Sequence, residues 1–304
     1  MAEIARFSGV DRTPQMKCFK PVQKIFVKRE FPNLFSVSAP DLYDYHAVKD
    51  DEEIRVLLVD SSTGQSTELV PFTELTKLSE IASKHEGFQR RAAYVLNDYD
   101  IPIRDGYDFY SILLAQDHAV DLSNDKYIAI EMRNLNAFAN KPEVLRPVYS
   151  VWGFEYGVVG SFAMKYTPMY LSPTELQKDF VVGVNDLIAI PIDLVREIQF
   201  FPKVVDGASP IYTKDELILD QEASNDLTTV PLRSNGVLSI PIDKTHGDQG
   251  DRNSVIWGLS FGFKRWAVMP LDLYRSFAIR RDASNQSFDF FLIDVVPTVV
   301  SDII

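Results

Sequence analysis

The chain has 304 residues, which is enough to bury a sizeable core in one large domain or two of ordinary size. Hydrophobic residues make up 46% and charged residues 24%, which excludes disorder over most of the length. The net charge of −12 argues against direct nucleic-acid binding, because proteins that wrap nucleic acid present a basic face.

Positive charge is concentrated at the beginning of the chain. Residues 1–31 hold seven basic and three acidic side chains, so this segment carries +4 and the remainder −16. We expect residues 1–21 to form an N-terminal arm. Two interpretations of the arm stay open, a solvated terminal strand without a partner and a contact with an anionic surface such as lipid headgroups.

The start of the chain lacks the apolar h-region of a secretory signal, and no apolar run reaches the 18 residues of a membrane span. Cys18 is the only cysteine, so an intrachain disulfide is impossible. We therefore expect the protein to be made and kept in a cytoplasm, or to be released from one by lysis.

Short apolar runs separated by turn signals predict β-strands along the whole chain. The expected strands are residues 22–29, 54–60, 92–97, 127–132, 148–154, 162–166, 187–192, 196–201, 237–242, 256–263 and 288–296. Aromatic residues make up 12%, and their flat rings pack well on a pleated sheet. Many short strands with polar breaks indicate a sandwich or barrel.

Helical spacing is scarce. Residues 72–86 place apolar side chains on one face of a helix, and residues 212–223 form a weaker window that begins with the capping box Thr213 and Glu216. The two helices fall at similar places in two strand–helix–strand patterns, with Leu75 and Leu217 offset by 142 residues.

This internal repeat predicts a mainly β chain with two tandem jelly rolls (a double jelly roll), each with one short helix in a long connection. We expect residues 22–140 to form the first jelly roll and residues 141–304 the second. The polar stretch 133–147, which contains two prolines, is the expected linker.

The element order resembles a known family. The segments IRVLLVD, an amphipathic helix, AAYVLN and YIAIEM resemble the first barrel of the double jelly-roll major capsid proteins, and REIQFFP, YTKDELILDQEA, VLSIPID and FDFFLIDVV its second barrel. This lineage includes tailless, membrane-containing bacteriophages and adenovirus. The resemblance covers roughly residues 22–296 and lies in element order, because the lineage has no short diagnostic motif.

The resemblance implies a virus structural protein located in the virion. Three chains would form a pseudo-hexameric capsomer, a homotrimer, and capsomers would tile an icosahedral shell. The implied partners are neighbouring capsomers, minor capsid or vertex proteins, and an internal membrane surface where one is present. The aromatic segments 106–110 (GYDFY) and 152–156 (WGFEY) would supply interface anchors or else core residues.

The sequence contains no pattern typical of catalysis, so we expect no enzyme, no catalytic residue and no cofactor. The four histidines His46, His85, His118 and His246 lack metal-ligand spacing. Gly153, Gly157 and Gly160 lack the lysine and the spacing of a phosphate-binding loop, which favours close packing or bulges.

Two acidic segments are the candidates for binding a metal ion, and the sequence leaves their metal binding unknown. Residues 50–53 and the pair Asp248 and Asp251 are either solvated faces or partial cation sites, and neither supplies the six to eight oxygens that Ca²⁺ needs. Cys18 has Lys17 and Lys20 beside it, which would lower its pKa, although a lone cysteine without a catalytic pattern is typically inert.

Other functions stay open beside the capsid interpretation. Paired jelly rolls also suit an amidase or a carbohydrate-active hydrolase, in which two carboxylates of unlike pKa would meet in a cleft. A vertex or spike protein, or a sugar-binding module, is the other class.

Overall fold

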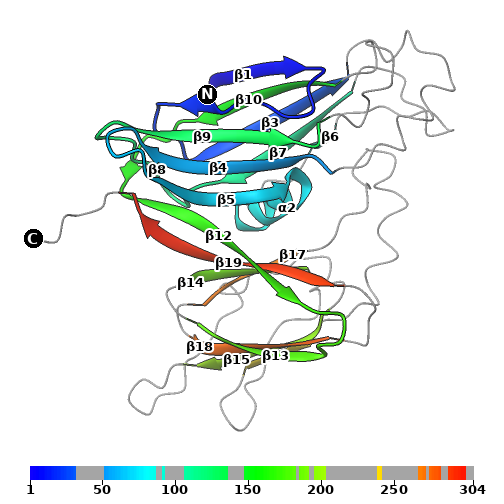
Figure 1. Ribbon diagram of the computed structural model, residues 1–304. Helices are drawn as coiled ribbons and strands as arrows, with labels where there is room; N and C mark the ends of the chain where they lie inside the picture. The colour runs from blue at the N-terminus through cyan, green and yellow to red at the C-terminus, as the bar shows by residue number, and fades with distance from the viewer. Residues whose placement is uncertain are drawn as a thin grey trace, which may run out of the picture.

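The computed structural model describes residues 1–31, 51–86, 91–92, 106–135, 147–182, 185–191, 195–202, 238–241, 266–271, 274–281 and 287–298. These residues form antiparallel sheets in two units, with one α-helix among the described residues (Figure 1).

The first unit is a sandwich of two antiparallel sheets. Its strands are β1 (Ala2–Ser8), β2 (Met16–Cys18), β3 (Lys24–Phe31), β4 (Glu53–Asp60), β5 (Ser66–Glu74), β6 (Arg91–Ala92), β7 (Gly106–Leu113), β9 (Lys126–Arg133) and β10 (Val148–Phe154). One sheet has the order β2-β9-β4-β5 and the other β1-β10-β3-β7-β6. In β4, Ile54, Val56 and Leu58 point into the sandwich and are buried, as the period of two in the sequence predicts.

Helix α2 (Leu75–Glu86) follows β5 directly and buries Leu75, Leu78, Ile81 and Ala82, the apolar face that the sequence predicts. The helix begins three residues later than predicted. Phe72 belongs to β5 because the antiparallel ladder with β4 continues to the pair Glu53–Glu74. In Figure 1, α2 lies between the first unit and the second.

The described residues of the second unit form eight strands in nested pairs. They are β12 (Phe162–Leu171), β13 (Gln177–Val181), β14 (Asn185–Pro191), β15 (Val195–Pro202), β16 (Leu238–Pro241), β17 (Trp266–Pro270), β18 (Tyr274–Arg281) and β19 (Phe288–Pro297). The first strand pairs with the last, the second with the seventh, the third with the sixth and the fourth with the fifth. This nesting is a long hairpin rolled into two sheets, β12-β19-β14-β17 and β13-β18-β15-β16, and it defines a jelly roll.

The sheet β12-β19-β14-β17 is buried on both faces. On one face, Phe290 packs against Phe180 and Phe277 inside the second unit. On the other face, Tyr166, Phe291 and other side chains belong to the same apolar cluster as α2, β5 and β7 of the first unit. This double burial explains why the four residues from Phe290 to Ile293 are all apolar instead of alternating.

Polar contacts also join the units. Tyr166 Oη donates to the carbonyl of Leu113 at 2.9 Å, and the amide of Met164 donates to the carbonyl of Leu114 at 2.7 Å. Two short strands, β8 (Ala119–Val120) and β11 (Val159–Gly160), pair in parallel across the same junction.

The mainly β architecture with two tandem jelly-roll units is therefore confirmed, as is the helix of the first unit. The helix expected at residues 212–223 and the strand expected at 256–263 lie outside the described residues. Strands β1, β2, β5, β7, β8, β11, β13, β17 and β18 were not predicted.

The strand pairing differs from the predicted division of the chain in two places. Residues 1–21, expected as an arm, include β1 and β2, which pair with β10 and β9. The sheets also do not divide at residue 140, because β10 pairs along its whole length with β3 of the first unit. The chain passes to the sheets of the second unit between Phe154 and Phe162.

A buried ion pair ties the two sheets of the first unit to α2. Arg29 on β3 donates to the Glu52 carboxylate at 2.6 Å, and Tyr149 Oη on β10 donates to the same oxygen at 2.8 Å. The Glu52 carbonyl accepts the amide of Leu75 at the start of α2. Both charged side chains are at most 5% exposed, so their mutual attraction offsets part of the cost of removing them from water.

Replacing Glu52 by Gln keeps the size of the side chain and leaves the Arg29 charge buried without its partner. We expect the free energy of unfolding in urea to fall by about 3–5 kcal/mol. The matched control is Glu68→Gln, which removes the partly exposed partner of Arg55 and should cost less than about 1 kcal/mol. Equal losses in both variants would contradict this role of the buried pair.

Candidate interaction surfaces

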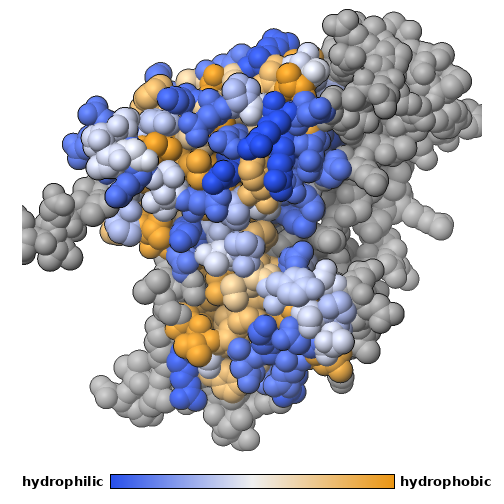
Figure 2. All heavy atoms as spheres, viewed as in Figure 1, coloured by the Kyte–Doolittle hydropathy of each residue, from blue (hydrophilic) through white to orange (hydrophobic). Residues whose placement is uncertain are grey.

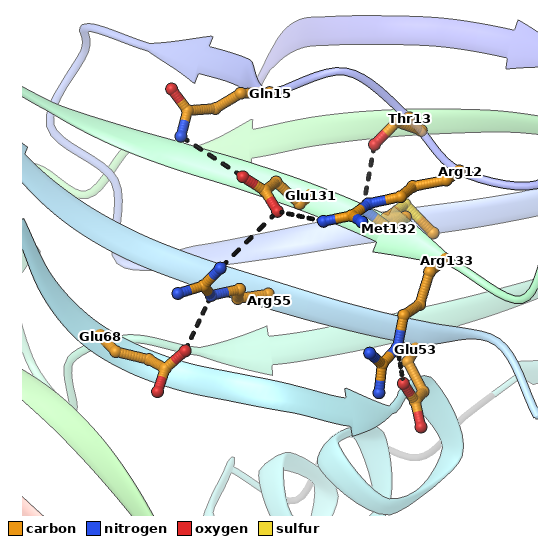
Figure 3. Close-up of polar contacts among 9 residues, drawn as sticks. All are labelled: Arg12, Thr13, Gln15, Glu53, Arg55, Glu68, Glu131, Met132 and Arg133. Carbon is orange, nitrogen blue, oxygen red and sulfur yellow. Dashed lines mark hydrogen bonds and ion pairs between the residues drawn. The ribbon is translucent and has the colours of Figure 1, made fainter.

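The outer face of the sheet β2-β9-β4-β5 carries an ion-pair network (Figure 3). Glu131 on β9 accepts from Arg12 at 3.3 Å and lies 3.8 Å from Arg55 on β4. Arg55 continues to Glu68 on β5 at 2.7 Å, and Arg133 pairs with Glu53 at the end of the same strands. The network joins three arginines to three glutamates, so its positive and negative charges cancel.

A single aromatic ring lies beneath this network. The guanidinium groups of Arg12, Arg55 and Arg133 lie 5.6, 5.7 and 4.0 Å from the centre of the Phe72 ring. Cation–π contacts of this kind hold the long side chains flat on the sheet. The result is a flat, ordered polar surface.

An apolar cluster adjoins the network on the same face. Leu57 and Val59 of β4 pack with Tyr127 and Ala129 of β9. The Phe19 ring, which is 66% exposed, lies 5.4 Å from the ring of Tyr127. Figure 2 shows hydrophilic residues over much of this side of the first unit, with hydrophobic residues among them.

The basic side chains of residues 1–31 have partners within the chain. Ion pairs join Arg6 and Lys28 to Glu30, Arg12 to Glu131, Lys20 to Glu155 and Arg29 to Glu52. Lys17 and Lys24 lie over the rings of Tyr127 and Phe154. The positive excess of this segment is therefore part of the sheets, which weakens the interpretation of a basic arm.

The two aromatic segments predicted as anchors occupy different positions. Residues 106–110 open β7, and Tyr110 is fully buried in the core. In the second segment, Phe154 ends β10, and Tyr156 beyond it is 43% exposed. The second segment thus offers a large exposed ring.

Two glycines sit where a side chain would not fit, as the sequence interpretation of close packing predicts. A Cβ at Gly153 would lie 2.7 Å from Val22 Cγ1, and one at Gly160 would overlap the imidazole of His118. Gly157 has open space. The backbone therefore approaches its neighbours closely on both sides of the exposed loop.

His118 fixes this close approach. Its Nε2 lies 2.9 Å from the carbonyl oxygen of Phe162, and its Nδ1 lies 2.8 Å from the carboxylate of Asp117. Because a carbonyl oxygen only accepts, Nε2 carries a proton. The hydrogen bond with His118 lowers the pKa of Asp117. Of the other histidines, His85 lies in the last turn of α2, while His46 and His246 are outside the described residues.

Cys18 is buried, and burial raises the pKa of its thiol, although the backbone hydrogen bond to Lys20 acts in the opposite direction. Burial therefore outweighs the lowering of the thiol pKa that the sequence led us to expect from the neighbouring lysines. A thiol that stays protonated is a poor nucleophile.

In the described part of the acidic segment 50–53, the carboxylates do not form a cation site. Glu52 is buried against Arg29, and Glu53 pairs with Arg133. Among the described residues, no group of three or more His, Cys, Asp or Glu is placed to hold a metal ion. Asp248 and Asp251 lie outside this part of the chain.

In the described part of the chain, no helix combines the length and the apolar character that a bilayer span requires.

Comparison with solved structures finds chains from two viruses that align over most of this chain. The major capsid protein P2 of bacteriophage PM2 shares 8% identity at a TM-score of 0.38, with 96% of this chain and 95% of that chain covered. A chain of the Sputnik virophage shares 7% identity at a TM-score of 0.26, with coverage of 96% and 85%. No family model and no curated protein matches the chain.

The packing of His118 on Gly160 predicts a selective effect of an added methyl group. Gly160→Ala should lower the free energy of unfolding by about 1–3 kcal/mol through overpacking, whereas Gly157→Ala should change it by less than about 0.5 kcal/mol. Thermal unfolding measures both. In a double-mutant cycle, adding Gly160→Ala to His118→Ala should cost less than adding it to the wild type. Strictly additive losses would refute the proposed overlap.

Burial of Cys18 predicts slow modification by N-ethylmaleimide at neutral pH. We expect the native thiol to react at least about tenfold more slowly than in urea, because thiolate formation and access are both suppressed. A Phe19→Cys variant in a Cys18→Ser background serves as the control, since position 19 is exposed, and it should react rapidly in the folded protein. Equal rates for the two thiols would show that Cys18 is accessible.

Proposed function

We propose that this chain is a shell-forming structural protein, the major capsid protein of a virus, and acts by self-association instead of catalysis. The observation that carries the proposal is the pair of jelly rolls joined through one sheet that packs an apolar core on each face. Such a fusion makes a rigid block whose remaining sheet faces point outward, and a lattice subunit needs broad lateral surfaces of this kind.

The ion-pair network and its neighbouring apolar cluster fit this role. A face with its charges balanced internally and the exposed Phe19 ring beside it has the mixed composition of a protein–protein interface with a polar rim. We infer three chains in a pseudo-hexameric capsomer, since two similar units per chain give six jelly rolls in a ring of three.

The further partners proposed are neighbouring capsomers and minor capsid or vertex proteins, within a virion assembled in a host cytoplasm. Direct binding of nucleic acid is not part of the proposal, because the chain carries a net charge of −12. The engagement of the basic N-terminal side chains within the sheets makes an internal membrane the weakest of the proposed partners.

The test is the mass and shape of the purified full-length chain. Size-exclusion chromatography with light scattering should give about three times the chain mass of 34.5 kDa, because a capsomer built from three chains is a stable unit. Negative-stain electron microscopy should show particles with a hexagonal outline. A monomer at every concentration tested would overturn the proposal, and so would hydrolase activity from a monomer with a carboxylate cleft.

A further inference from the structure

Five large apolar side chains are exposed near the place where the chain passes from the first unit to the second. They are Phe19, Tyr156, Val158, Val159 and Phe162, which are between 43% and 66% exposed. We call them the apolar end. It lies at the left of Figure 1, around β8 and the beginning of β12.

An ion pair and a backbone hydrogen bond hold the segments that carry these side chains. Lys20, next to Phe19, pairs with Glu155, next to Tyr156, at 3.3 Å. The carbonyl of Val158 accepts from the amide of Ala119 at 2.7 Å. Two segments far apart in sequence, residues 19–20 and 155–162, thus meet at one place.

The backbone beneath the apolar end is firmly held. Gly160 packs against His118, and β11 pairs with β8. Thr298 donates its amide to Ser161 at 2.7 Å, and its carbonyl accepts from the buried ammonium group of Lys126 at 2.6 Å. A surface that is already ordered loses little conformational entropy on binding.

The exposed apolar area is large for an isolated surface. About half of each of five large side chains amounts to several hundred Å², which is roughly the size at which patches on monomers mark interaction sites. A standard interface buries about 800 Å² per partner around an apolar core. The apolar end supplies a core of that kind.

The surface is also continuous with a contact that the chain already makes. Along β12, Phe162, Met164 and Tyr166 point to the same side of the sheet, and the last two are buried against the first unit. Phe162 is the outermost member of this row and remains 48% exposed. A neighbouring molecule that covered Phe162 would continue, beyond this chain, the apolar contact that joins the two units.

Charged groups border the apolar end. The Asp117 carboxylate is 88% exposed, while the exposed Glu155 is paired with Lys20, which is 64% exposed. The exposed Asp117 carboxylate disfavours anionic lipid headgroups and nucleic acid as partners. It also disfavours two apolar ends facing each other, because the two Asp117 charges would be brought together.

From these observations we infer that the apolar end is the docking surface for a second copy of this chain, which contributes a different part of its own surface. This inference rests on the proposed shell function and names one of its contacts. A contact between unlike surfaces is heterologous, and it closes into a ring when the rotation between copies allows.

The first experiment compares the full-length wild type with Val158→Glu by sedimentation velocity over a dilution series. A charge placed in a desolvated contact should raise the dissociation concentration at least about tenfold. Val181→Glu is the matched control, since Val181 is 83% exposed and lies on β13 of the other unit, and it should leave dissociation within about twofold of the wild type. Circular dichroism and the melting temperature verify that each variant folds, and Tyr156→Ser provides a second variant of the same surface.

The outcomes separate this inference from the proposed function. If the wild type stays monomeric, both fail. If it associates and both Val158→Glu and Tyr156→Ser associate equally well, the docking surface is elsewhere and the shell function stands. If Val158→Glu instead abolishes flotation with phosphatidylcholine–phosphatidylglycerol vesicles without changing association, the occupant is a lipid surface and the inference is overturned.

A second experiment identifies the opposing surface. A Val158→Cys variant in a Cys18→Ser background is labelled with a benzophenone maleimide and mixed with ¹⁵N-labelled wild type. Photo-cross-links should join the label to peptides of the ¹⁵N copy that lie outside residues 155–162. Cross-links confined to the same chain, or joining position 158 to the same region of the other copy, would refute a heterologous contact.

Discussion

The sheet β12-β19-β14-β17 is shared between two apolar cores, and the rest of the structure depends on this double burial. One face closes the second jelly roll through Phe290, and the other packs Phe291 and Tyr166 against the first unit. A strand buried on both faces cannot be exposed without losing contacts on each side. The two units therefore behave as one block, and their relative orientation is fixed by side-chain packing.

Polar interactions define the position of each element around this apolar frame. Glu52 joins both sheets of the first unit and the start of α2, because its carboxylate meets Arg29 and Tyr149 while its carbonyl meets Leu75. At the junction, His118 and Lys126 hold the chain where it leaves one unit for the other. Such contacts fix the positions of the strands and the helix more sharply than apolar packing alone would.

A rigid block with ordered outer faces is suited to repeated contact with copies of itself. The ion-pair network shows how a charged surface is made flat, since Arg12, Arg55 and Arg133 lie over one aromatic ring. The apolar end shows the complementary feature, an exposed hydrophobic group on an immobile backbone. Both follow from fusing two sandwiches along one sheet, which leaves the other faces free to meet neighbours.

The sequence by itself determined the strands whose apolar runs are long, the apolar face of α2, and the close packing at Gly153 and Gly160, because each depends on local periodicity or on backbone space. It missed β1 and β2, whose short polar sequences become strands only by pairing with β10 and β9. The same limit applies to the candidate surfaces. Phe72 was predicted on the helix and instead underlies the ion-pair network, and the members of the apolar end are up to 143 residues apart, between Phe19 and Phe162. Only the tertiary structure brings such residues together, because register and sheet packing are decided between distant segments.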